Sequence, residues 1–165
     1  MIEFTESSVS LPRRSELRSP LPGGVCHSSK RNPSPPQSVY DSAQDEADRH
    51  KWIESQKRGC DLGRQAQEDW YQRFWHNYCR AKRLEHLTGH QQWVEFADHE
   101  FGQMYQHVVS GNQRLTRILE KIEAGAENLD IICWGHDEQL PMAELLTMLE
   151  MVNINIARLE PRLRD

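Results

Sequence analysis

Three arginines on one side of a predicted helix are the first residues whose type and spacing suggest a chemical role. Arg73, Arg80 and Arg83 lie seven and three positions apart, so they share a helix face. The stretch from Trp70 to Leu84 contains no acidic residue and carries a local charge of about +4. Such a row can contact phosphates, so a small DNA-associated regulator is one hypothesis. A solvated basic face is the simpler interpretation, because the chain has a net charge of −5 at pH 7.

A second set of polar residues surrounds a predicted corner between two helices. His50-Lys51-Trp52, then Ser55, then Gly59-Cys60-Asp61-Leu62-Gly63 resembles a segment of an uncharacterised bacterial protein family, with the form His-Lys/Arg-Trp, Ser, Gly-x-Asp-x-Gly. The resemblance implies a bacterial protein and no particular activity.

The corner also has a physical interpretation. Its glycines permit a tight turn, Asp61 caps the second helix, and Trp52 anchors the first helix against the second. Alternatively, His50, Trp52 and Ser55 line a binding site, or His50, Glu54 and Asp61 form an enzyme-like ligand or metal site.

The remaining histidines and cysteines show no motif for catalysis or metal binding. Cys79, His86 and His90 form the densest group, but no His-Glu-x-x-His or Glu-x-x-His pattern occurs, and no Gly-x-Ser-x-Gly is present. The four cysteines are scattered, which disfavours a zinc ribbon or a disulfide framework. We therefore expect no cofactor and no metal, lean against an enzyme, and expect free thiols in the cytoplasm.

The elements that position these residues are predicted to be helices. Ser42 resembles a capping residue, so the first helix should run from about residue 41 to Arg58, with Gly59 as its left-handed cap. The second should run from about 62 to 88. On it Trp70, Tyr71, Phe74, Trp75 and Tyr78 share one face, which predicts a core surface. A partner groove and a base-stacking platform are the alternatives.

The C-terminal half shows helical periodicity in two segments. Apolar residues recur at three-four spacing over 98–124 and over 141–160, which predicts an antiparallel coiled-coil-like hairpin. A break at Ser110-Gly111-Asn112 remains open, because glycine disfavours a helix interior. Residues 91–97 are a strand-like link or a helical turn, and 126–139 are expected to be a connection with a short extended segment.

The last helix has more apolar surface than one neighbour would cover. Met148, Met151 and Ile154 lie beside its main apolar row. This helix therefore either sits centrally in the bundle or meets another copy of itself.

Residues 1–40 differ in composition from the rest of the chain. They are rich in serine and proline and lack apolar periodicity, which predicts a disordered tail. Within this tail, Lys30 to Pro36 matches a basic polyproline-II ligand pattern, with an inert segment as the alternative. No run of 18 apolar residues occurs, so we expect no membrane partner.

Together these patterns predict an all-α protein with a disordered tail over 1–40 and a helical domain over 41–165. The domain should be a small bundle of four or five helices. We expect a non-enzymatic protein-interaction or structural module, with a protein partner or a homo-oligomer. A DNA-associated regulator using Arg73, Arg80 and Arg83 is the first alternative, so nucleic acid remains a possible partner. A site at His50, Trp52 and Asp61 is the second.

Overall fold

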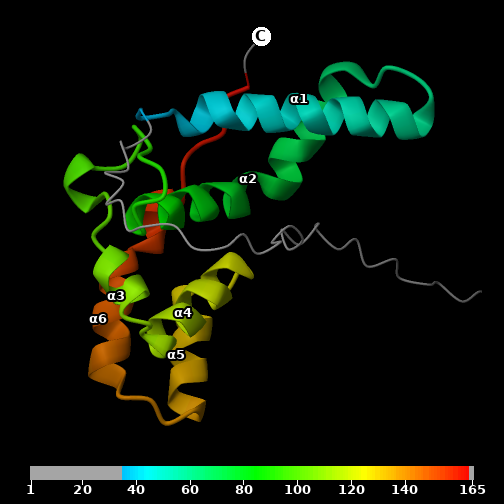
Figure 1. The fold of residues 1–165 in the computed structure, drawn as a ribbon. Coiled ribbons are helices and arrows are strands. Elements are labelled where there is room, and N and C mark those ends of the chain that lie inside the picture. The colour runs from blue at the N-terminus through cyan, green and yellow to red at the C-terminus, as the bar shows by residue number, and fades with distance from the viewer. Residues whose placement is uncertain (1–34, 164–165) are drawn as a thin grey trace, which may run out of the picture. The chain divides into compact units, whose positions relative to one another are not determined.

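The computed structural model describes residues 35–163, and their regular structure is helical, which confirms the all-α fold class (Figure 1). The predicted tail up to residue 34 lies outside the described residues, and so does its Lys30 to Pro36 motif apart from the last two prolines. The elements are α1 (Val39–Arg58), α2 (Gly63–Leu87), the 3₁₀ turn η1 (Asp98–Glu100), α3 (Tyr105–Val109), α4 (Gln113–Glu123), α5 (Asn128–Asp137), α6 (Met142–Val152) and the 3₁₀ turn η2 (Ile154–Ala157).

Helix α1 begins at Val39, earlier than the sequence predicts, because a distant residue completes its cap. The Ser38 hydroxyl accepts hydrogen bonds from the first turn and donates to Glu95 at 2.6 Å. The Glu95 carboxylate also accepts from the Val39 amide at 2.8 Å. Ser42 lies inside the helix, where its hydroxyl accepts a hydrogen bond from Tyr78 at 2.7 Å, so the prediction that Ser42 marks the start is wrong.

The α1–α2 corner forms where the glycines predict it. Gly59 ends α1 with φ of +69°, a left-handed conformation that glycine adopts without strain, and α2 starts at Gly63. The Asp61 carboxylate accepts from the Gly63 amide at 2.9 Å, and the Ser55 hydroxyl accepts from the Leu62 amide at 3.1 Å. These two bonds hold the turn, and the helices it joins pack against each other.

The aromatic face of α2 is largely core, as predicted. Trp70, Tyr71 and Trp75 are buried against the small residues Ala43 and Ala47 of α1. The alanines leave room for the large rings, whose burial contributes several kcal/mol at about 25 cal/mol per Å². Phe74 differs, with 40 % of its surface exposed, so the face is not wholly buried.

A second core cluster lies at the other end of α2. It joins Leu84 and Leu87 to buried residues of the later helices, among them Ile118, Ile131 and Leu149. Helix α2 therefore belongs to both cores, and it is the element that connects α1 to the C-terminal helices.

The continuous helix expected over 98–124 does not form. It divides into η1, α3 and α4, because Gly111 adopts φ of +70° and Asn112 caps α4 by accepting from the Leu115 amide at 3.2 Å. The break that the sequence left open at Ser110-Gly111-Asn112 is therefore real, and the predicted seam is not one coiled-coil stripe.

The expected connection over 126–139 is also wrong, since it contains α5. Glu127 and Asp130 form a reciprocal capping box at its start. Helix α5 packs against α6, and a short turn joins the two (Figure 1). Helix α6 ends at Val152 rather than near residue 160, because Asn153 adopts a left-handed conformation with φ of +42°. The helical hairpin is thus α5 with α6, not the pair of segments that the periodicity suggested.

Candidate functional site

The predicted basic stripe on α2 is not an exposed surface. Arg83 is fully buried, and Glu100 of η1 accepts two hydrogen bonds from its guanidinium at 2.7 and 2.8 Å. Its Nε donates to the Val152 carbonyl oxygen at 3.2 Å. Arg80 is also buried and pairs with Glu127 at the start of α5. Both arginines therefore join α2 to other elements.

The remaining arginine of the stripe, Arg73, is exposed. Its Nε contacts the Asp69 carboxylate at 2.8 Å, one helical turn away. The expectation of a three-arginine face turned to solvent is wrong because the carboxylates that bury the other two lie on distant elements. Sequence spacing along α2 cannot reveal them.

One opening at the α1–α2 corner contains His50. Its Nε2 lies 3.2 Å from the Asp69 carboxylate, and its ring meets Phe74 edge-on at 5.8 Å between centroids. Glu54 and Arg58 also line this space, which has a volume of about 130 Å³. A hydrogen bond from Lys57 lowers the pKa of Glu54 below its usual value. This small polar space holds an imidazole–carboxylate pair and no described nucleophile.

Trp52 and Asp61 line a different, wider opening of about 650 Å³. The Trp52 side chain is 65 % exposed, so the prediction that it anchors α1 against α2 is wrong. Cys60 and Ser55 share this opening, whereas His50 and Glu54 do not. The structure therefore divides the predicted corner site between two openings. Within residues 35–163, no group of three histidine, cysteine, aspartate or glutamate side chains could hold a metal.

The dense histidine and cysteine group is structural. His86 is buried; the Trp93 amide donates to its Nδ1 at 3.1 Å, and its Nε2 donates to the Ala97 carbonyl oxygen at 3.1 Å. Burial lowers the pKa of His86. Burial also raises the pKa of the Cys79 thiol to about 12, while His90 is exposed. His86 thus fixes the loop after α2, and the three side chains do not form a site.

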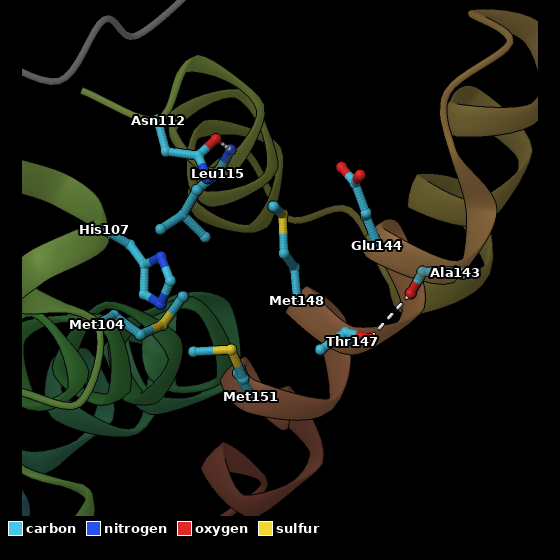
Figure 2. Close-up of a pocket in the computed structure, with 9 residues that line it drawn as sticks. All are labelled: Met104, His107, Asn112, Leu115, Ala143, Glu144, Thr147, Met148 and Met151. Carbon is cyan, nitrogen blue, oxygen red and sulfur yellow. Dashed lines mark hydrogen bonds between the residues drawn. The ribbon is translucent and has the colours of Figure 1, made fainter. Parts of the chain in front are cut away.

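An apolar opening lies between α6 and the segment over 104–115, which contains α3 and the first turn of α4 (Figure 2). We call it the methionine groove. It has a volume of about 340 Å³ and is lined by Met104, His107, Asn112, Leu115, Ala143, Glu144, Thr147, Met148 and Met151. Sequence reasoning found only its Met148 and Met151 side, as the surplus apolar surface of the last helix.

Two faces of α6 explain the groove. Leu145, Leu149 and Val152 are buried in the second core, while Met148 and Met151 pack against its edge, line the groove and remain half-buried. Methionine is unbranched and flexible, so it can adapt to differently shaped contacts.

The polar groups around the groove mostly have intramolecular partners. The Thr147 hydroxyl donates to the Ala143 carbonyl oxygen at 2.9 Å, and Glu144 pairs with Arg114 of α4. No nucleophile paired with a base lines the opening among the described residues. The arrangement suits apolar side chains better than acid–base chemistry.

Comparisons of the chain with protein-family models, with curated proteins and with solved structures give no match. None of the helices that the structure describes is long and apolar enough to cross a membrane.

Proposed function

We propose that this protein is a non-enzymatic protein-interaction module whose methionine groove binds the apolar side of a helical segment from a partner protein. The observation that carries the proposal is the groove itself, an apolar opening at the surface lined by flexible methionines. Its volume of about 340 Å³ leaves room for one or two large apolar side chains of a partner.

Exposed apolar residues next to the groove support a docking surface. Helix α3 has no buried residue, and Tyr105, Val108 and Val109 are all exposed on it. Its other residues include His107, which lines the groove. A partner helix in the groove would also cover part of α3.

Charge favours a basic partner. Residues 104–152 contain eight aspartates and glutamates against three arginines and lysines, a net charge of −5. A second copy would bring another segment with a net charge of −5 against this one, whereas a basic amphipathic helix carries the opposite charge. We therefore propose a cationic, amphipathic helical segment as the occupant.

The test uses an 18-residue leucine–lysine amphipathic peptide and a scrambled peptide of the same composition, with the full chain in fluorescence anisotropy. Ala143→Arg places a long side chain in the groove. Ala124→Arg is the matched control, because the substitution adds the same charge at an exposed position at the far end of α4. Ala124 does not line the groove. We expect the amphipathic peptide to bind and Ala143→Arg to weaken it by about tenfold or more, with little effect of Ala124→Arg.

Equal binding of both peptides, or equal effects of both variants, would refute the proposal. Light scattering tests the second copy as the occupant. If the protein forms a stable dimer that Ala143→Arg dissociates and Ala124→Arg does not, the occupant of the groove is a second copy of the chain and not a basic partner. The DNA-associated regulator and the enzyme-like corner remain untested predictions, and no contact of Arg73, His50 or Asp61 adds support to them.

A further inference from the structure

We infer that the methionine groove is also a binding site for a soft monovalent metal ion, Cu(I), held by the thioethers of Met104, Met148 and Met151 and the imidazole of His107. All four side chains line the same opening (Figure 2). Three of the five methionines of the chain are gathered there. This inference does not depend on a docked partner.

The ligands come as two pairs with the same spacing. Met104 and His107 are three residues apart at the start of α3, and Met148 and Met151 are three residues apart on α6. Residues at this spacing lie on the same side of a helical turn. Both pairs line the same opening, where the side chains of Met104, His107 and Met151 turn toward one another and Met148 extends from α6 toward Leu115 (Figure 2).

Three of the four side chains are accessible for coordination. Among the described residues, no hydrogen bond or ion pair engages the His107 ring, and Met148 and Met151 are only half-buried. Methionine side chains have three rotatable bonds, so their sulfur atoms can adjust around an ion. Met104 is fully buried and forms the inner wall of the opening.

The ligand atoms in the groove, thioether sulfur and imidazole nitrogen, favour Cu(I) over other metal ions. Thioether sulfur is a soft ligand that favours Cu(I), and imidazole also suits copper. Hard ions such as Mg²⁺ and Ca²⁺ prefer carboxylate oxygens, and Glu144, which lines the groove, is paired with Arg114. Neutral ligands in an apolar space suit an ion of single charge better than one of double charge.

Because cysteine thiols could also bind the added Cu(I), the measurement must report directly on the methionine side chains. Cys60 and Cys133 are exposed, and thiolates also bind Cu(I). The experiment is an anaerobic titration of the full chain, labelled with ¹³C at the methionine methyls, with Cu(I) carried past the four cysteine equivalents and followed by NMR. Met142 is the internal control, because it packs against the second core as Met148 and Met151 do but does not line the groove.

We expect the methyl signals of Met104, Met148 and Met151 to shift together at one further equivalent, while that of Met142 stays in place. The double variant Met148→Leu, Met151→Leu keeps the apolar volume and should weaken this binding by at least about tenfold. Met142→Leu should leave it unchanged. Absence of the shifts, or equal binding by the double variant, would overturn the inference. The titration contains no peptide, so either result is separate from the docking proposal.

Discussion

The buried pair of Arg83 and Glu100 gives the sharpest prediction about stability. Glu100→Gln preserves the shape of the side chain and removes the charge that faces the buried guanidinium. Breaking a buried ion pair from one side costs about 3–5 kcal/mol, because the remaining charge has no partner. Glu100 keeps 16 % side-chain exposure and the Val152 carbonyl still accepts from Arg83, so we expect the lower end, about 3 kcal/mol.

The assay is urea unfolding of the full chain, followed by tryptophan fluorescence and circular dichroism. At a slope of about 2 kcal/mol per M, this loss lowers the midpoint by roughly 1.5 M. Glu144→Gln is the control, because its pair with Arg114 is exposed and should contribute at most about 1 kcal/mol. Replacing both partners, as in Arg83→Met with Glu100→Leu, should cost less than Glu100→Gln alone. A loss below about 0.5 kcal/mol for Glu100→Gln, or additive effects in the double variant, would refute the assigned role of the pair.

Three further predictions concern other sites. Burial lowers the pKa of His86 below the usual histidine value of about 6.5, so the unfolded chain binds the proton more readily and stability should fall as pH drops below about 6.5. Urea midpoints between pH 7.5 and 5.5 measure this, and His86→Gln should remove most of the slope. Gly59→Ala should lower stability by about 1 kcal/mol, because φ of +69° is strained for alanine; an unchanged thermal melt would contradict this. A thiol reagent should modify Cys60 and Cys133 rapidly in the native protein and Cys79 only after unfolding, as peptide mass mapping would show.

Local sequence signals predicted the N-terminal half of the fold well. Gly59 set the end of α1, and the aromatic spacing on α2 identified most of the first core, because both signals depend on residues close together in the chain. The predicted start of α1 failed for the opposite reason, since Glu95 completes its cap from a loop far along the chain.

The candidate sites were harder to predict. The arginine stripe was interpreted as a surface because its spacing along α2 is visible, whereas the carboxylates that bury Arg80 and Arg83 lie on other elements. The groove was only half visible, because the surplus methionines of α6 can be read from the helix but Met104 and His107 reach them through folding.

The sequence by itself determined the helical class, the corner at Gly59 and the aromatic core surface, because periodicity and backbone preference act over a few residues. Tertiary structure alone decided which charges are buried and which side chains share an opening. These outcomes depend on partners distant in the chain, and their free energies come from burial and pairing between elements rather than from local propensity.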